Sequence, residues 1–318
     1  MKKNSPIVYI NIPTFNNEKT IKQTLYSILN QTYKNIRVKV IDNGSTDKTL
    51  LKIKEIKNKK ISVVKNYSKK GMYNLAKAYE SKKNYICIYH SDDIYHKNIV
   101  EKQIEYLKKN KDAILVSTKA IIINENNKVV GKTNKNLKKF LFKNQYEILK
   151  IIFNQYNIIN CPSVMLNNKL LKSKKKIRWN IKRYGNSADL DFYLQILNFG
   201  NIKILNEFLC SIRVTKKQIT NYERVKNTKS DFLKVIDDYI KKKEIKRNLD
   251  FDDKLNIDIL RFRDKIRIIN NHYNKKEYNK IKIKIKKINF FKFIKLFQLS
   301  SRYLYTLLFI FYFKLFFS

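Results

Sequence analysis

Glycine, proline, cysteine and histidine are all scarce in this 318-residue chain, with 5, 3, 3 and 3 copies respectively. The few glycines form neither a GxGxxG dinucleotide fingerprint nor a P-loop, so neither of these nucleotide-binding motifs is present. The cysteines are odd in number and lack metal-ligand spacing, which argues against a disulfide framework and indicates a reducing compartment. Because histidines are also few, we expect no zinc site.

A secretory signal peptide is also missing from the N-terminus. The apolar run at 7–12 follows basic residues, but it is shorter than a signal-peptide core and contains Asn11. We therefore expect the globular part of the protein to be cytoplasmic. With 43% hydrophobic residues, the chain is long enough for one α/β domain with a sizeable core plus an extension.

Acidic residues are few relative to basic ones: 26 Asp and Glu face 69 Lys and Arg, which gives a net charge of +43. Nucleic-acid binding is one interpretation of this excess. However, the lysines run through the whole chain and accompany many Asn, Ile and Tyr residues, as AT-rich coding would produce. We therefore do not expect nucleic acid as the main partner, and anionic lipid or a phosphorylated substrate fits the charge equally well.

Strand-like and helix-like segments alternate along the first half of the chain. Strands are predicted at 7–12, 38–41, 61–64, 85–89 and 113–116, with helices between them near 21–29, 50–53, 72–81 and 100–107. Pro13 is expected to close the first strand, and Asn16 or Asn17 to cap the first helix. This alternation predicts right-handed βαβ units and an α/β, Rossmann-like fold, in which helices flank a mainly parallel sheet.

Three polar loops then open on the carboxyl-terminal edge of this sheet, where open α/β folds bind ligands. They are 13–17, 42–45 and 91–93. In the first two, the backbone near Pro13 can pack on a base ring while Asp42 accepts a hydrogen bond from a base N–H. In the third, Asp92 and Asp93 offer the hard oxygen ligands that suit Mg²⁺ or Mn²⁺, which could in turn hold a phosphate. Each loop taken singly is ordinary turn chemistry.

Taken together, the loops closely resemble the opening of family-2 nucleotide-sugar glycosyltransferases of GT-A fold. The segments that carry the resemblance are Ile10–Glu18, Ser27–Tyr33 and Ile41–Asp47, and His90–Asp93 looks like the family's metal-binding DxD-type motif. The resemblance covers about residues 5–215. It implies an inverting transfer of a sugar from a UDP- or GDP-linked donor to a glycan or lipid-linked acceptor.

The same resemblance implies roles for individual residues. Those implied to bind the nucleotide sugar are Pro13, Thr14, Asn16 and Glu18 around the nucleoside, Asp42 at the base, and Asn43, Gly44, Ser45, Ser91 and Asp92. Asp92 and Asp93 are implied to hold the donor diphosphate through Mg²⁺ or Mn²⁺. His90 is interpreted as a strand-end residue rather than a metal ligand.

The candidate catalytic base lies in the second half of the chain. Ser187–Leu194 resembles the family's acidic motif at a helix start, which implies that Asp189 deprotonates the acceptor hydroxyl, with Asp191 as the alternative. Inversion by a single displacement needs a base opposite the leaving diphosphate. Without the resemblance, Asp189 would be interpreted as a helix cap. One departure is Thr215, which stands where relatives often have a histidine that can complete the metal site.

The chain changes character after about residue 220, so we predict a catalytic domain at 1–220 and a helical extension at 221–318. Phe290, Phe293, Ile294 and Phe297 form one apolar helical face, with lysines on the opposite side. The uncharged aromatic run 303–313 would cover roughly 16 Å as a helix, about half of the ~30 Å hydrocarbon core. From about 288 we therefore predict a monotopic anchor on anionic membrane. Docking on the globular core or in a dimer interface is the alternative.

The sequence thus predicts a metal-dependent, inverting glycosyltransferase peripherally attached to the inner face of a bacterial membrane, where it extends a surface polysaccharide. Its oligomeric state is not predicted. A nucleotidyltransferase is the rival enzyme, although 13–16 lacks the Gly-rich basic phosphate loop that such enzymes typically use. A non-enzymatic basic module that binds membrane or nucleic acid is the rival from another class.

Overall fold

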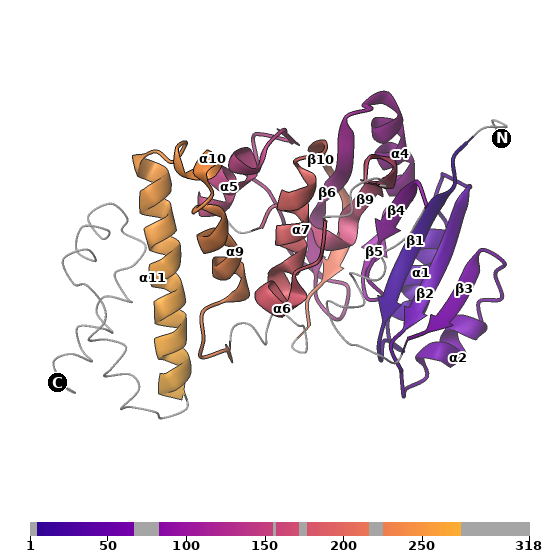
Figure 1. The fold of residues 1–318 in the computed structure, drawn as a ribbon. Helices are drawn as coiled ribbons and strands as arrows, with labels where there is room; N and C mark the ends of the chain where they lie inside the picture. The colour runs from indigo at the N-terminus through magenta and orange to yellow at the C-terminus, as the bar shows by residue number, and fades with distance from the viewer. Residues whose placement is uncertain (1–4, 67–82, 155–156, 172–176, 216–224, 275–318) are drawn as a thin grey trace. The chain divides into compact units, whose positions relative to one another are not determined.

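The computed structural model describes residues 5–66, 83–154, 157–171, 177–215 and 225–274 (Figure 1). The chain divides into two compact units, Met1–Lys217 and Gln218–Ser318. The first unit contains a mixed sheet with helices, and the described part of the second unit is helical.

Runs of β-branched residues form most of the sheet, because such side chains pack well on a pleated surface. The strands are β1 (Val8–Thr14), β2 (Ile36–Asp42), β3 (Ile61–Lys65), β4 (Tyr85–Ile88), β5 (Ile94–Tyr95), β6 (Ala113–Ile123), β7 (Val129–Lys132), β8 (Leu141–Phe142), β9 (Val164–Asn167) and β10 (Asn201–Arg213). Their order in the sheet is β3-β2-β1-β4-β9-β6-β10-β5, with β7 paired to β6 and β8 to β10.

Most of the residue pairing in this sheet is parallel, as predicted. The strands β3, β2, β1 and β4 run parallel to their neighbours, and so does the long pair of β6 and β10. Between these blocks lies β9, which is antiparallel to both β4 and β6. Because β9 reverses direction, β4 and β6 still point the same way and present their carboxyl ends at one edge.

Helices of the first unit pack on this sheet through apolar faces. They are α1 (Ile21–Leu29), α2 (Thr49–Lys54), α4 (Ile99–Lys109), α5 (Gln145–Asn154), α6 (Ile181–Tyr184) and α7 (Ala188–Ile196), with short 3-10 turns η1 (Cys161–Ser163), η2 (Asn168–Leu170) and η3 (Gly185–Ser187). Helix α1 contacts β5 and α4 contacts β6. Full burial of each Ile or Leu side chain contributes roughly 1.5–3 kcal/mol relative to exposure.

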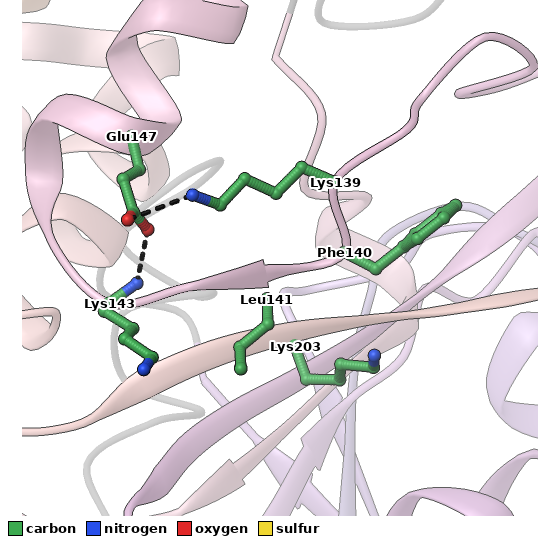
Figure 2. A pocket seen from close by; sticks show the side chains of 6 residues that line it. All are labelled: Lys139, Phe140, Leu141, Lys143, Glu147 and Lys203. Carbon is green, nitrogen blue, oxygen red and sulfur yellow. Dashed lines mark hydrogen bonds and ion pairs between the residues drawn. The ribbon is translucent and has the colours of Figure 1, made fainter.

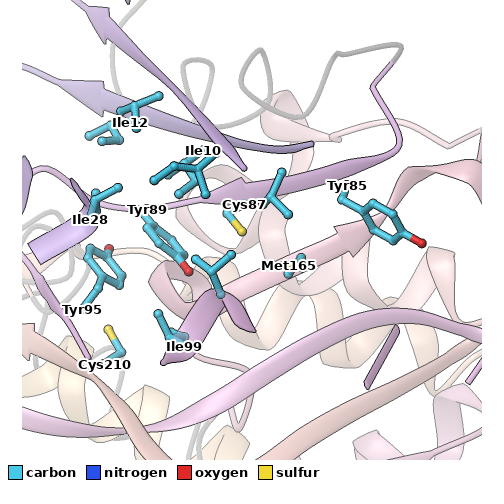
Figure 3. Close-up of a cluster of buried hydrophobic side chains, with 14 of the residues drawn as sticks. Ile10, Ile12, Ile28, Tyr85, Cys87, Tyr89, Tyr95, Ile99, Met165 and Cys210 are labelled. Atoms are coloured by element: carbon cyan, nitrogen blue, oxygen red, sulfur yellow. The ribbon is translucent and has the colours of Figure 1, made fainter. Parts of the chain in front are cut away.

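The main core lies beneath β1 and β4 (Figure 3). There Tyr89 and Tyr95 stack with ring centroids 3.9 Å apart and planes 9° apart. Cys87 and Cys210 are buried nearby as small apolar side chains. This stacked pair lies immediately before and after the His90–Asp93 loop, so the core fixes both ends of that loop.

Two local expectations were wrong, and a third lies outside the described residues. Pro13 does not close β1: it pairs in register with Ile41, and the strand continues to Thr14. Proline lacks only the amide donor, and near a strand end this loss is tolerated. Helix α1 begins at Ile21 and not directly after Asn17, whose side chain is used between loops instead. The helix predicted at 72–81 lies outside the described residues.

The second unit is built from α9 (Asp231–Tyr239), α10 (Lys243–Lys246) and α11 (Phe251–Asn274). Ser230 caps α9 by accepting a hydrogen bond from the Leu233 N–H, and Arg261 joins α11 to α9 through Asp237 at 2.8 Å. Among the described helices, none combines the length and the apolar character needed to cross a bilayer. The predicted anchor from about 288 lies outside the described residues.

Candidate active site

The loops after β1 and β2 are joined by reciprocal hydrogen bonds. The Asn16 N–H donates to Ser45 Oγ (3.0 Å), and the Thr46 N–H donates to Asn16 Oδ1 (2.8 Å). Asn16 has a φ of 52° and Gly44 a φ of 83°, in the left-handed region that asparagine tolerates and glycine favours. The register that pairs Thr14 with Asp42 brings both turns to the same edge of the sheet.

Asp42 holds its own loop in the structure. Its side chain is buried and accepts hydrogen bonds from the Gly44 N–H (3.2 Å) and the Ser45 N–H (3.3 Å). The neighbouring Asn43 is also buried, and its Oδ1 atom has no hydrogen-bond partner among the described residues. Asn43 Oδ1 is therefore an acceptor in this loop that a bound nucleoside could engage.

Glu18 links the same two loops. Its Oε2 accepts a hydrogen bond from the Lys48 N–H (2.9 Å), and its own N–H donates to Asp47 Oδ2 (3.1 Å). Burial raises the pKa of Asp47, but hydrogen bonds from the Thr49 side chain and from backbone N–H groups together lower it below its usual value. Pro13 is partly buried and Thr14 is buried, so the first loop starts from a fixed strand end.

The third loop joins the other two through Asn17. Ser91 Oγ donates to Asn17 Oδ1 (3.0 Å), and the Asn17 N–H donates to Thr49 Oγ1 in α2 (2.8 Å). From α1, Thr24 Oγ1 lies 3.1 Å from the Ser91 carbonyl and 2.7 Å from that of Asp93. The predicted convergence of the three loops is therefore present in the structure. Thr24 could not be recognised from the sequence, because a threonine inside a helix is usually a packing residue.

The three side chains of His90, Asp92 and Asp93 each offer a ligand atom, and these atoms lie within 4.8 Å of one another. Asp93 is buried, and its Oδ2 atom accepts no hydrogen bond among the described residues. His90 Nδ1 lies 3.7 Å from this oxygen, and although 33% of the His90 side chain is exposed, its Nε2 atom is buried without a partner there. A divalent cation would satisfy such groups. The structure therefore places His90 in this group, where the sequence interpretation gave it no part.

The titration of this group reflects its burial. Burial, followed by the charge of Asp92, raises the pKa of the Asp93 carboxyl well above its usual value, against the opposing effect of Arg213. Burial also lowers the pKa of His90. Ionising Asp93 is thus costly unless positive charge is added beside it. A bound cation would supply that charge.

Arg213 ends β10, which pairs with β5, the strand that begins directly after Asp93, and it holds the acidic loop from there. It is buried, and its backbone N–H donates to Asp93 Oδ1 (2.8 Å) while Nε donates to the Asp92 carbonyl (2.8 Å). Its remaining guanidinium nitrogens donate to the carbonyls of Asn124 and Glu125 and to Gln23 Oε1 in α1. Arg213 was assigned no role from the sequence, so this contribution was missed.

The two candidate bases in α7 have different surroundings. Asp191 is buried, and its Oδ2 accepts hydrogen bonds from Asn180 Nδ2 (2.6 Å) and Gln195 Nε2 (2.7 Å). Asp189 is only partly buried and accepts a hydrogen bond from the Leu190 N–H (2.8 Å). Burial raises the pKa of Asp189 to about 6. Asp189 thus has the proton affinity of a general base, whereas Asp191 has the contacts of a structural residue.

Cys161 connects this helix with the metal-type group. Burial raises the pKa of its thiol, and the charges of Asp189 and Asp93 raise it further. Both carboxylates therefore lie close enough to Cys161 to act on it electrostatically, although 96 residues separate them in the sequence (189 − 93). Cys161 begins η1, which contacts β4, the strand that ends just before the His90–Asp93 loop.

A separate pocket of about 530 Å³ lies away from these residues (Figure 2). Its lining residues are Lys139, Phe140, Leu141, Lys143, Glu147 and Lys203. Strand β8 pairs with β10 at Ile202 and Lys203, whereas Arg213 ends the same strand. The pocket therefore lies near the start of β10 and contains none of the predicted site residues.

Comparison with known proteins agrees with this geometry. The family model described as Glycosyl transferase family 2 matches residues 9–171. An uncharacterized glycosyltransferase of Methanocaldococcus jannaschii is 32% identical over 70% of this chain and 76% of its own length. WfgD of Escherichia coli, named a UDP-Glc:alpha-D-GlcNAc-diphosphoundecaprenol beta-1,3-glucosyltransferase, is 31% identical over 68% of this chain and 80% of its own.

Two solved structures share the fold at low sequence identity. S. aureus TarS 1-349 in complex with UDP-GlcNAc has a TM-score of 0.56 at 17% identity, covering 84% of this chain and 72% of that one. The mannosyltransferase PcManGT from Pyrobaculum calidifontis, in complex with GDP-Man and Mn²⁺, has a TM-score of 0.54 at 13% identity, covering 76% and 66%. From the family match, the relatives and the fold together, the chain belongs to glycosyltransferase family 2 and has the GT-A fold.

Proposed function

We propose that this glycosyltransferase is a divalent-metal-dependent, inverting enzyme that transfers a sugar from a UDP- or GDP-linked donor to a glycan or lipid-linked acceptor. The observation that carries the proposal is the His90, Asp92 and Asp93 group, whose ligand atoms lie within 4.8 Å of one another; Asp189, a carboxylate of raised pKa, supports it. Family membership leaves the nucleotidyltransferase and the non-enzymatic module without support.

In this mechanism, Asp189 removes the proton from the acceptor hydroxyl. The acceptor oxygen then bonds to the anomeric carbon as the bond from that carbon to the diphosphate oxygen breaks, and the configuration inverts. A carboxylate with a pKa of about 6 is ionised at neutral pH, yet it binds a proton more readily than an ordinary aspartate does. The Leu190 N–H fixes one carboxylate oxygen and leaves the other for the acceptor.

On the donor side, the joined loops after β1 and β2 would hold the nucleoside between Pro13 and Asn43, and the residues of the first loop would fix its ribose. Asp92 and Asp93 would hold Mg²⁺ or Mn²⁺, which, when bound, neutralises charge on the departing diphosphate. Arg213 keeps these two residues in place through its hydrogen bonds to both.

The names of relatives suggest the biological setting. WfgD and WfaP of Escherichia coli are named for transfer of glucose to a diphosphoundecaprenol-linked GlcNAc. We extend this setting to the present chain as synthesis of a bacterial surface polysaccharide on a lipid-linked acceptor. The enzyme would then work in the cytoplasm at the inner face of the membrane, held there by the basic and aromatic residues from about 288.

A donor screen combined with product analysis tests the proposal. Thermal unfolding is measured with UDP or GDP, each with and without Mn²⁺, and donor hydrolysis is then measured across sugars linked to the stabilising nucleotide. We expect a rise in Tm that needs nucleotide and metal together, and NMR of the product should show an inverted anomeric configuration. A product of retained configuration would contradict the assignment of Asp189, and a response to no nucleotide would contradict the proposed donor class.

A further inference from the structure

The position of His90 is set by the core and not by a flexible loop. Its N–H donates to Tyr95 Oη (2.7 Å), and the Tyr95 ring stacks on Tyr89, the residue that precedes His90 (Figure 3). Tyr89 and Tyr95 are both buried. The backbone at His90 is therefore held by a packed aromatic pair, which pre-orients the imidazole beside Asp93.

Hydrogen bonds among the described residues do not satisfy the His90 imidazole. The 3.7 Å between His90 Nδ1 and Asp93 Oδ2 is too long for a hydrogen bond, and the Nε2 atom is buried without a partner among these residues. Asp93 Oδ2 is also buried and accepts no hydrogen bond there. Each of these two buried polar atoms carries a desolvation cost, which a cation held by the two side chains would reduce.

We infer that His90 is a nitrogen ligand of the divalent cation and that it makes the site prefer Mn²⁺ to Mg²⁺. This inference rests on the proposed function, since it concerns the same ion that Asp92 and Asp93 would hold. The three side chains already present their ligand atoms within 4.8 Å of one another. One imidazole nitrogen with carboxylate oxygens is a mixed donor set.

The donor set determines the preference. Mg²⁺ binds oxygen ligands in nearly ideal octahedra and gives up its waters reluctantly, so an imidazole nitrogen adds little to its binding. First-row transition ions accept imidazole together with carboxylate, and Mn²⁺ is the member of that series closest to Mg²⁺ in its use of oxygen ligands. A site of aspartates alone would separate the two ions less. The His90 imidazole would therefore give this site a preference for Mn²⁺ over Mg²⁺ that its aspartates alone would not give.

Electron spin-echo spectroscopy of Mn²⁺ bound to the full-length protein with UDP or GDP tests this inference directly. We expect nitrogen modulation from a directly bound imidazole in the wild type and in His96→Asn, and its loss in His90→Asn. His96 is a matched control because it is exposed, lies six residues further along the chain (96 − 90), and does not belong to the group. The absence of imidazole modulation in the wild type would overturn the inference even if His90→Asn did not fold.

Metal affinities separate this inference from the proposed function. Mn²⁺ and Mg²⁺ are each titrated into the nucleotide complex. The ratio of Mn²⁺ affinity to Mg²⁺ affinity should fall about tenfold or more in His90→Asn, and each tenfold change corresponds to ~1.4 kcal/mol. The ratio should be unchanged in His96→Asn. If Asp92→Asn and Asp93→Asn abolish Mn²⁺ binding while His90→Asn leaves the ratio unchanged, His90 is not a ligand and the metal site itself stands. If the wild type binds no Mn²⁺ in the presence of either UDP or GDP, the proposed metal dependence fails, and this inference fails with it.

Discussion

The backbone N–H of Arg213 donates a hydrogen bond to Asp93 Oδ1 at 2.8 Å, across 120 residues of sequence. The Arg213 guanidinium adds a bond to the Asp92 carbonyl, so the last residue of β10 holds both acidic residues of the metal-type group. The Asp92–Asp93 turn depends on a strand that does not neighbour β4 in the sheet. The geometry of the group is thus a property of the whole sheet.

Replacing Arg213 by Lys should destabilise the fold and weaken metal binding together. Lysine keeps the charge but lacks the planar fork that reaches Asp92, the β6–β7 turn and Gln23 at once, so several of these acceptors would lose their donor. We expect about 2–4 kcal/mol less stability in denaturant unfolding. The exposed Arg37 provides the control, since Arg37→Lys should stay within about 0.5 kcal/mol of wild type. Equal stability of the two variants would contradict the role of Arg213.

Asp189→Asn should lower kcat by about 10²–10⁴-fold and leave the KM for the donor nearly unchanged, because proton removal belongs to the chemical step. Asparagine keeps an oxygen for the Leu190 N–H, so the helix start is preserved. Steady-state kinetics against both substrates measure the two effects. If Asp191→Asn is folded but inactive while Asp189→Asn is active, the base has been assigned two residues too early.

The pH dependence of kcat should report the raised pKa of Asp189. The base works only when ionised, so with a pKa of about 6 the rate should fall as the pH drops through 6 and be about tenfold lower at pH 5. If the base had the pKa of an ordinary aspartate, kcat would change little until the pH fell to about 4. Rates measured at saturating metal and donor provide the test, and a plateau extending below pH 5 would count against Asp189.

Asp189→Asn should also make the protein more stable at neutral pH. The folded-state pKa lies above the ordinary value, so the folded protein binds the proton more tightly, and the cost of ionisation is fully present only above about pH 6. A rise from 3.8 to about 6 corresponds to at most ~3 kcal/mol, which partial exposure of the side chain reduces to about 1–2 kcal/mol.

The gain in Tm over wild type should therefore shrink as the pH falls from 6 to 4. Asp191→Asn should have the opposite effect, because the amides of Asn180 and Gln195 both donate to Asp191 Oδ2, and a neutral amide oxygen is a weaker acceptor than a carboxylate oxygen. A stability of Asp189→Asn that equals wild type at pH 7 would contradict the raised pKa.

Truncation after about residue 287 should separate catalysis from membrane binding. It removes Phe290, Phe293, Ile294, Phe297 and the aromatic run that follows, and it keeps every proposed site residue. We expect the truncated enzyme to use a short soluble acceptor but to lose activity on a lipid-linked acceptor in anionic vesicles. Vesicle binding by the full chain should weaken with salt, which screens lysine–lipid attraction. Failure of the full chain to bind vesicles would refute the anchor.

Local patterns in the sequence were enough to predict β1 to β4, β6 and the three loops. Each predicted strand from 7–12 to 113–116 is present, because short runs rich in β-branched and other apolar residues are typical of strands. The strands β9 and β10 were not predicted, and the antiparallel position of β9 depends on partners in β4 that lie 76 to 82 residues earlier (164 − 88 and 167 − 85). Propensity does not carry such non-local information.

The residues of the candidate site also fall into those that the local sequence predicted and those that it did not. Asp92 and Asp93 follow a strand and were predicted, whereas the contributions of Arg213, Thr24 and Cys161 depend on contacts between distant segments. The motif favoured Asp189 and left Asp191 as the alternative. The amide partners of Asp191 could not be predicted from that motif, since one of them, Asn180, lies in the irregular segment before α6.

The dependence of Asp93 on β10 also has a consequence for the order of events during synthesis. At translation rates of about 5–20 residues per second, Arg213 leaves the ribosome roughly 6–24 s after Asp93. The strands β1 to β4 are complete by then and can already bring the loops after β1 and β2 together. A nascent chain would therefore acquire its nucleotide-facing loops first, and its acidic turn would lack its final anchor until β10 has paired with β6.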